Sequence, residues 1–316
     1  MKKLLVLFLC AFPFVSFADT EELIANAEQL YDATRLMCAG ISDEISKVSN
    51  ISKVNTAVTA AGTVAAGGAL YAGIKKSQEE EEIEALIEEM CAKGGCDPDK
   101  VEAMDDATFF ETVIEPYARI AELQEKIEQS KKLGNWRTGL LAGTIGTNLA
   151  SAIISGINTN QSDLIQHISA CNEMVKRVPE ISTQLNIAGV NPMEHDVVNK
   201  LRNVSTWCNK IDTHDIEKIE NRMKGVMGTS IAGTVIGAVG VGTSAAANSD
   251  KYMDLENKVK LSEEDKKKEH ALNTTANVMA GANVATGAVE TGLNISLISL
   301  TKKLIASAER CEETLK

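Results

Sequence analysis

The chain has 316 residues, of which 44% are hydrophobic but only 4% are aromatic, and it contains five prolines. A β-sandwich or β-barrel needs many turns and ring-rich strands, so this composition argues against both and favours long helices packed through small residues. The formal net charge is −12. Nucleic-acid phosphates attract clustered Lys and Arg, so we expect no nucleic-acid partner.

Residues 1–18 read as a secretory signal peptide. Lys2 and Lys3 form a basic start, residues 4–14 form an apolar core, and Ser-Phe-Ala at 16–18 is a small-x-small cleavage site. We therefore expect an exported protein of the periplasm or cell envelope.

Helical patterns fill the first half of the mature chain. A helix over 19–37 is interrupted at Gly40, after which Ser42 is expected to cap the next helix. An amphipathic helix ends at Gly-Gly 94–95, and Asp-Pro 97–98 starts another. A charged, coiled-coil-like arm follows around 120–127, and Pro179 is expected to stop the last helix of this half.

The second half begins near a turn at Asn-Pro 191–192. Asp212 is expected to cap a long helix, and Asn-Ser-Asp at 248–250 signals the next turn. Ser262 with its acid-rich first turn then predicts a final helix that ends at Glu312 or later.

A short motif recurs through this helical chain. Ala-Gly-Thr-Val at 61–64 returns as Ala-Gly-Thr-Ile at 142–145 and as Ala-Gly-Thr-Val at 232–235, with a degenerate copy at 280–282. Each copy lies in a stretch of small and aliphatic residues with almost no charge. These stretches are 57–74, 138–157, 225–247 and 277–300.

The cysteines indicate that the two halves are a tandem duplication. Cys38 and Cys208 are each followed by Ile at the third position and by a capping residue at the fourth, and Leu-Ile precedes Cys171 and Cys311 at the same spacing. We therefore predict an all-α protein of two long antiparallel helical hairpins with Gly/Ala-rich apolar tips and coiled-coil-like arms. The first covers 19–180, with an inserted helical segment at about 77–136, and the second covers 181–316.

Antiparallel hairpins also narrow the disulfide pairing. Six cysteines remain after the signal peptide, an even number that suits disulfides in an oxidising compartment. The repeat sets Cys38 beside Cys171 and Cys208 beside Cys311. Cys91 and Cys96 bracket the Gly-Gly turn, so we expect a third disulfide there.

The glycines of the uncharged stretches are interpreted as helix-packing positions. Small residues spaced by four, such as Gly139, Gly143, Thr147 and Ser151, let two helix backbones approach closely. Glycine costs up to about 1 kcal/mol in a helix relative to alanine, so close packing is needed to recover that cost. The predicted packing positions are Gly62, Gly67, Gly143, Gly146, Gly233, Gly237, Gly281 and Gly287.

No catalytic, cofactor or metal site is predicted, and no small-molecule substrate is identified. The four histidines lack ligand spacing; they are His167, His195, His214 and His270. The acidic run Glu79–Glu82 is interpreted as a solvated helix face, because its carboxylates point around the helix rather than converging.

Two environments remain open for the uncharged stretches. They are long enough to enter a bilayer, with Lys75-Lys76, Trp136-Arg137, Arg222, Lys224 and Lys302-Lys303 as flanking anchors. They also suit the core of a soluble bundle, and Glu290 counts against insertion unless it is paired. The favoured function is a non-enzymatic envelope protein with a structural or interaction role, pairing with itself, another envelope protein or the bilayer. The alternatives are a pore-forming protein and a soluble secreted binding module.

Overall fold

The computed structural model describes residues 20–92, 120–159, 162–211 and 213–316. Helices and short turns make up these ranges, and they contain no strand, which confirms the all-α class. Five predictions fall outside the described residues: the signal peptide, the turn at 94–95, the helix start at 97–98, Cys96 as the partner of Cys91, and the cap at Asp212.

Contacts between residues divide the chain into two compact units. Unit 1 comprises Met1–Asn50, Asn160–Glu220 and Ile298–Lys316, and unit 2 comprises Ile51–Thr159 and Asn221–Leu297. Each unit therefore draws segments from both predicted halves of the chain.

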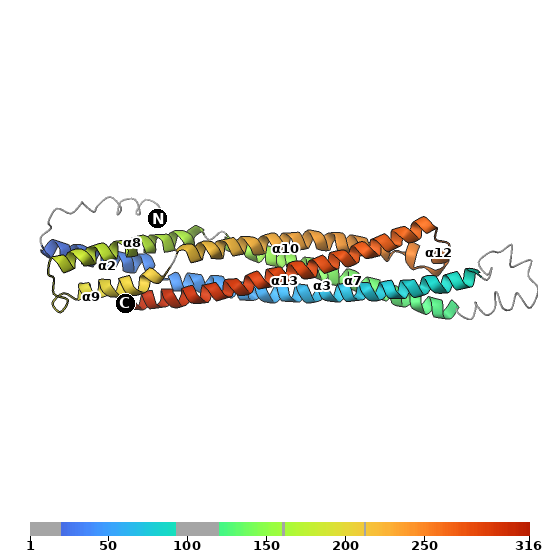
Figure 1. The fold of residues 1–316 in the computed structure, drawn as a ribbon, viewed down its shortest axis with the longest axis horizontal. Coiled ribbons are helices and arrows are strands. Elements are labelled where there is room, and N and C mark those ends of the chain that lie inside the picture. Colours follow the sequence, from blue (N-terminus) through green and yellow to red (C-terminus); the bar gives the residue numbers. More distant parts are fainter. Residues whose placement is uncertain (1–19, 93–119, 160–161, 212) are drawn as a thin grey trace, which may run out of the picture. The chain divides into compact units, whose positions relative to one another are not determined.

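In unit 1 three helices pack together: α2 (Thr20–Cys38), α8 (Ser162–Ile187) and α9 (Asp196–Trp207) (Figure 1). The 3-10 turn η2 (Cys208–Lys210) follows α9. Disulfides join Cys38 to Cys171 and Cys208 to Cys311, with Cα–Cα distances of 4.8 and 4.6 Å. These are the two pairs that the repeat predicts, and disulfides indicate an oxidising environment outside the cytoplasm.

A side chain from the far end of the sequence caps the start of α3 (Ile41–Ala92). Gly40 adopts a positive φ of 81°, which ends α2 and turns the chain into α3. The Ser42 backbone N–H donates to Glu312 Oε1 at 3.0 Å, and its hydroxyl donates to Oε2 at 2.7 Å. The expected cap by Ser42 itself is therefore wrong, because the carboxylate of Glu312 accepts the open donors of the first turn.

Pro179 does not stop α8, contrary to the sequence-based expectation. The helix continues to Ile187 with Pro179 inside it, and the Thr183 hydroxyl donates to the Pro179 carbonyl at 2.7 Å. Pro179 lies on the exposed face while Val175 and Val178 are buried. Proline removes only the hydrogen bond to the Val175 carbonyl, and the packing of buried Val175 and Val178 keeps the helix in place.

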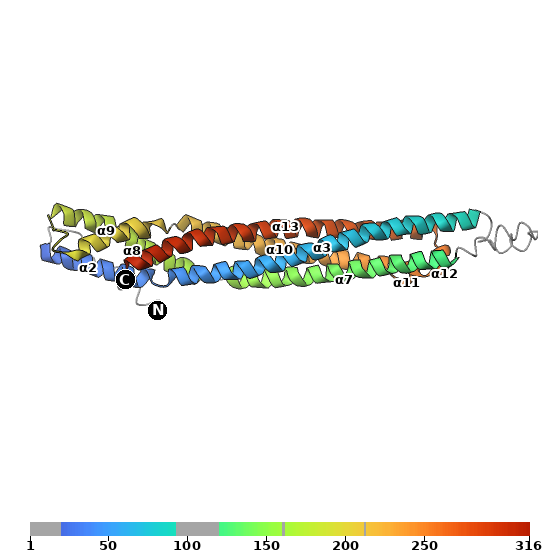
Figure 2. The ribbon, with the colours of Figure 1, turned by 90° about the horizontal axis from the view of Figure 1, so that it is seen from below.

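Unit 2 is a four-helix bundle built by α3, α7 (Ile120–Thr159), α10 (Thr213–Ala247) and α13 (Glu263–Thr314) (Figures 1 and 2). Contacts run from α3 to α7 and α13, and from α10 to the same two helices. As residue numbers rise along α3 and α10, those of their partners on α7 and α13 fall. This antiparallel order is compatible with the predicted hairpins.

Two short helices, α11 (Asp250–Met253) and α12 (Leu255–Val259), connect α10 to α13. Ser262 caps α13: the Asp265 N–H donates to the Ser262 hydroxyl oxygen at 3.1 Å, and that hydroxyl lies 3.0 Å from Asp265 Oδ2. The Ser262 hydroxyl thus satisfies an open N–H of the first turn, so the sequence-based start of the last helix agrees with the structure.

Buried positions recur every seven residues along the helices of unit 2. On α3 they alternate at spacings of three and four, the pattern of a left-handed coiled coil. These positions on α3 are 52, 55, 59, 62, 66, 69, 73 and 76. Many of them carry Ser, Asn, Thr or Gly instead of the usual Leu or Ile, so the core of this bundle is small and polar.

Candidate functional site: a polar core inside an apolar belt

An asparagine layer lies at one end of the polar core of unit 2. Asn55 Nδ2 donates to Ser155 Oγ at 3.2 Å and to Asn294 Oδ1 at 3.3 Å, which ties α3 to α7 and α13. All three residues are buried, and Asn55 Oδ1 and Asn294 Nδ2 have no partner. Together with Ser52 they line a small cavity of about 10 Å³, which is about the least space that admits one water molecule.

Glu290 precedes Asn294 on α13 by about one helical turn and lies within the bundle. Glu290 is 1% exposed, and both Ser151 from α7 and Ser230 from α10 contact its Oε1 atom; Ser230 Oγ lies at 2.6 Å. The two serine oxygens are 3.0 Å apart. Three helices therefore contribute oxygens to one closed cluster around a single acid.

Glycines bring the helices close together beside this cluster. A Cβ added to Gly62 would meet Thr147, with 3.1 Å to its Cβ, and one added to Gly287 would meet Thr63. A Cβ on Gly233 would lie 2.5 Å from Asn148 Nδ2, and one on Gly237 would lie 2.8 Å from Ile145 Cγ1. Half of the predicted packing glycines therefore lie against a neighbouring helix of unit 2.

The other four predicted packing glycines have nothing within 4 Å of an added Cβ among the described residues; they are Gly67, Gly143, Gly146 and Gly281. Gly139 and Gly143 are exposed, whereas Ser151, in the same spacing-of-four row, is buried. A row spaced by four drifts around the helix, and buried positions alternate by three and four. The expected continuous Gly139–Ser151 packing face is therefore wrong.

A thin apolar layer interrupts the polar core. Ala69, Leu141 and Ala280 are fully buried and pack together, and Leu140 lies partly buried against them. Gly240 faces this layer, where an added Cβ would lie 3.1 Å from Met279 Cβ. The layer separates the Glu290 cluster from the charged residues beyond it.

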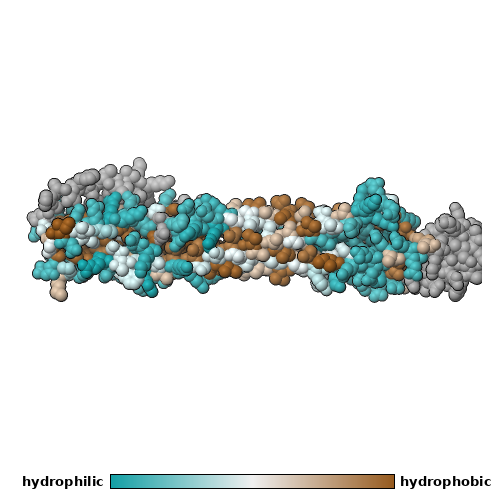
Figure 3. Space-filling model, in the orientation of Figure 1, coloured by the Kyte–Doolittle hydropathy of each residue, from teal (hydrophilic) through white to brown (hydrophobic). Residues whose placement is uncertain are grey.

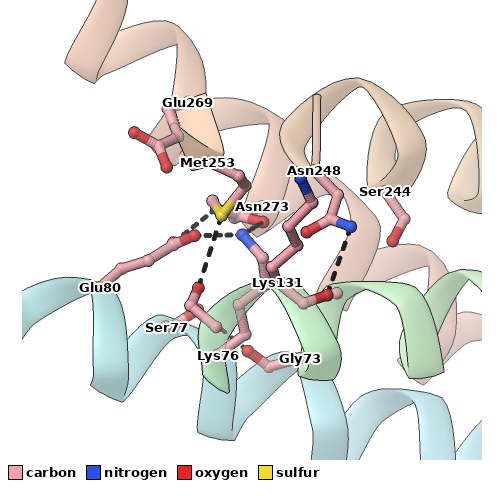
Figure 4. Close-up of polar contacts among 12 residues, drawn as sticks. Gly73, Lys76, Ser77, Glu80, Lys131, Ser244, Asn248, Met253, Glu269 and Asn273 are labelled. Carbon is pink, nitrogen blue, oxygen red and sulfur yellow. Dashed lines mark hydrogen bonds and ion pairs between the residues drawn. The ribbon is translucent and has the colours of Figure 1, made fainter. Parts of the chain in front are cut away.

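Beyond the apolar layer, two cationic side chains are buried completely. Arg137 donates to Ser244 Oγ at 2.8 Å and to Asn273 Oδ1 at 2.8 Å, both neutral acceptors. Lys76 donates to Asn273 Oδ1 at 3.3 Å and forms an ion pair with Glu80, as Figure 4 shows.

A second buried ion pair follows at the same end of unit 2. Lys258 from α12 lies 2.6 Å from Glu269 on α13, and their side chains are 3% and 4% exposed. Burial raises the pKa of Glu269, and the ammonium of Lys258 opposes this shift. Next to this ion pair, the core of the bundle consists of apolar side chains, among them Ile83, Leu123 and Ile127.

The outer surface of unit 2 has the opposite character. Exposed large apolar side chains occur on all four helices within the uncharged stretches and at their edges: Val54, Val64, Tyr71, Ile74, Trp136, Leu149, Ile153, Ile231, Val235, Val239, Val278, Val289 and Ile295. In Figure 3 the middle of this unit is brown and white, and teal residues follow toward α11 and α12. We call these side chains the apolar belt. On α3 the apolar belt runs from Val54 to Ile74, a length of about 30 Å, which matches the thickness of a bilayer's hydrocarbon core.

The residues expected as flanking anchors divide between surface and core. Trp136 is 72% exposed and Tyr71 is 64% exposed, and both lie near the Lys76 end of the belt. Lys75 is exposed, whereas Lys76 and Arg137 point into the core and are unsuited to reach lipid headgroups. The expected anchoring role of Lys76 and Arg137 is therefore wrong, because their partners lie inside the bundle.

Among the described residues, three helical regions are long and apolar enough to cross a membrane: Thr20–Glu89, Ile120–Gly156 and Asp196–Ala247. The helix α13 is not one of them. Its hydropathy is lowered by buried polar residues such as Asn273, Asn283 and Glu290, although its exposed face carries Val278, Val289 and Ile295.

The histidines lie apart from the polar core. His167 lies 3.3 Å from Glu44, and His214 lies 3.8 Å from Glu217. His195 precedes α9 at its N-cap position without a side-chain cap hydrogen bond, and His270 is exposed on α13. Within the described ranges no three His, Cys, Asp or Glu residues gather in a way that suits a metal ion.

Comparison with protein-family models, with curated proteins and with solved structures found no match. The interpretation of the site therefore rests on its own geometry. Sequence analysis missed the partners of Glu290 and the inward orientation of Arg137. A heptad count places Arg137, Asn148 and Ser151 on one face of α7. Core positions of a heptad usually carry apolar residues, so these polar side chains did not indicate a core face.

Proposed function

We propose that this chain is an exported, non-enzymatic protein of the cell envelope whose unit 2 lies in a lipid bilayer, where it has a structural or interaction role. The observation that carries the proposal is the inverted distribution of polarity in unit 2. Its exposed surface has an uncharged apolar belt, while Glu290, Arg137 and several asparagines lie in its core.

This distribution is unfavourable in water. A helix at the surface of a soluble bundle normally presents a polar outer face, and soluble monomers rarely expose large contiguous apolar patches. In a bilayer the same surface is solvated by lipid chains, and polar side chains within spanning segments face the bundle interior. The geometry therefore favours the membrane over the soluble alternative.

The packed core argues against a permanently open pore. The cavity beside Asn55 is about 10 Å³, and the apolar layer of Ala69, Leu141 and Ala280 is fully buried. Vesicles loaded with a small dye should therefore retain it after reconstitution of the full chain. Dye release that depends on the protein would favour the pore-forming alternative instead.

A single substitution separates the membrane from the soluble alternative. Val235 is 60% exposed in the middle of the belt. On a helix in water, Val235→Lys is neutral or slightly stabilising, because lysine is the better helix former. In the middle of a bilayer, lysine costs about 2.5–3.5 kcal/mol.

The measurement is carbonate-resistant membrane association in cells, with flotation of the purified chain on liposomes. The parent should float, and Val235→Lys should float much less. Leu36→Lys is the matched control, because Leu36 is 71% exposed but lies in unit 1. A parent that stays in the soluble fraction, or equal flotation of parent and Val235→Lys, would refute the proposal.

The proposed interaction partner is a second copy or another envelope protein. Gly143 and Gly146 have no side chain, and no described residue covers them, so the surface of the belt is low at these positions. Small residues of this kind let helices approach closely in lipid. Gly143→Leu should therefore reduce energy transfer between labelled copies in vesicles without unfolding the chain. Unchanged transfer would mean that these positions face only lipid.

A further inference from the structure

We infer that Glu290 is a buried proton-binding site: Ser151, Ser230 and the glutamate hold a carboxylic-acid proton in the core of unit 2 at neutral pH. The inference rests on contacts inside the bundle and holds whether or not unit 2 lies in a bilayer. The bound form is the neutral acid, so one proton adds to the carboxylate and no other bond changes.

Counting hydrogens in the cluster supports the neutral acid. Four oxygen–oxygen contacts lie within hydrogen-bond distance: Ser151 Oγ to Glu290 Oε1, Ser230 Oγ to Glu290 Oε1 at 2.6 Å, Ser230 Oγ to Ser151 Oγ at 3.0 Å, and Ser230 Oγ to the Val226 carbonyl at 2.8 Å. Each serine hydroxyl carries one hydrogen, so the serines alone fill two of these contacts. A carboxyl proton supplies a third.

The surroundings offer no compensating charge among the described residues. The neighbouring core positions are Thr59 and Gly62 on α3, Asn148 and Ser155 on α7, Val226 and Gly233 on α10, and Gly287 and Asn294 on α13. None of these groups is charged or titrates near neutral pH. Arg222 donates to Ser296 instead. An isolated buried carboxylate is costly, and taking up a proton removes its charge.

A metal ion fits the cluster poorly. Hard cations such as Ca²⁺ take six to eight oxygen ligands at 2.3–2.6 Å. The described side chains place oxygens from only three residues here, and these oxygens already lie within hydrogen-bond distance of one another. The chemistry of the site therefore suits a proton.

The structure also indicates the side from which the proton exchanges. Asn294 lies one helical turn from Glu290, and together with Asn55 it leaves unpartnered polar atoms at a cavity that can hold one water. On the other side, the buried layer of Leu141 and Ala280 separates Glu290 from Arg137. Exchange should therefore pass the asparagine layer.

Infrared spectroscopy of the full chain in detergent, comparing the parent with Glu290→Gln, tests the protonation state. At neutral pH the parent should show a protonated-carboxyl stretch that shifts in heavy water and is missing from Glu290→Gln. A difference spectrum that contains carboxylate bands instead would overturn the inference. So would a stability increase with Na⁺ or Ca²⁺ that Glu290→Gln abolishes.

Glu269→Gln is the matched control for stability, because the same substitution there leaves the buried ammonium of Lys258 without its partner. Glu290→Gln should unfold at nearly the parent's temperature, since the amide resembles the neutral acid. Glu269→Gln should unfold at a clearly lower temperature. Equal losses in the two variants would show that Glu290 is ionised. If Glu290→Gln does not fold, the parent's own infrared spectrum, recorded as the pH is raised, decides.

Discussion

Two glycines in nearly identical local sequence offer a direct test of what the tertiary structure adds. Gly143 lies in Ala-Gly-Thr-Ile and Gly233 lies in Ala-Gly-Thr-Val. Each sits inside a long helix, so replacing either by alanine gains up to about 1 kcal/mol of helix propensity. Local sequence alone therefore predicts that both variants become more stable by the same amount.

The structure predicts opposite outcomes. A Cβ at position 143 meets nothing within 4 Å among the described residues, so Gly143→Ala should keep the full gain. At position 233 the Cβ would lie 2.5 Å from Asn148 Nδ2, 3.1 Å from Asn148 Cγ and 3.4 Å from Asn283 Oδ1. Both asparagines are buried, and overpacking of this kind costs about 1–3 kcal/mol. Gly233→Ala should therefore be destabilised by roughly 0–2 kcal/mol after the propensity gain is subtracted.

The assay is unfolding of the full chain in detergent, by heat and by denaturant, followed by far-ultraviolet circular dichroism. The expected order of stability is Gly143→Ala, then the parent, then Gly233→Ala. Gly233→Leu should lie lower still, because a larger side chain forces α7 and α10 further apart. If Gly143→Ala and Gly233→Ala shift together in the same direction, the assignment of inward and outward glycines is refuted.

Three further predictions concern interactions within unit 1 or within unit 2. Lys258→Met should cost about 3–5 kcal/mol, because it leaves the buried Glu269 carboxyl without its ammonium partner. The double variant Lys258→Met/Glu269→Leu should recover most of that loss, and a double variant as unstable as the single one would show that the pair itself is not the cause. Glu312→Ala should cost about 1 kcal/mol by uncapping α3, and hydrogen exchange at its first turn should rise, while unchanged exchange there would contradict the cap at Ser42. Peptide mapping without reductant should recover the two disulfides of unit 1, and a peptide that joins Cys38 to Cys208 would contradict the structure.

Several features followed from the sequence because their causes are local or repeated. The all-α class came from small-residue composition and few prolines, and the cap at Ser262 needs only residues of its own first turn. The cysteine pairs could be predicted because Cys38 and Cys208 occupy matching places in the two halves, as do their partners. Where residues close in sequence carry the interaction, the pattern of residue types is sufficient evidence.

Other features depend on neighbours that only the tertiary structure brings together. The cap at Ser42 comes from Glu312, which is 270 residues away. The cluster at Glu290 joins three helices. Whether Gly143 or Gly233 packs against a neighbouring helix depends on which side of its own helix faces that neighbour. In this bundle, core positions carry Ser, Asn and Gly while Val and Ile lie outside, so hydropathy does not show the heptad. The sequence therefore shows that the four stretches are uncharged and rich in small side chains. The packing of the helices decides which of these residues face the core and which face the surroundings.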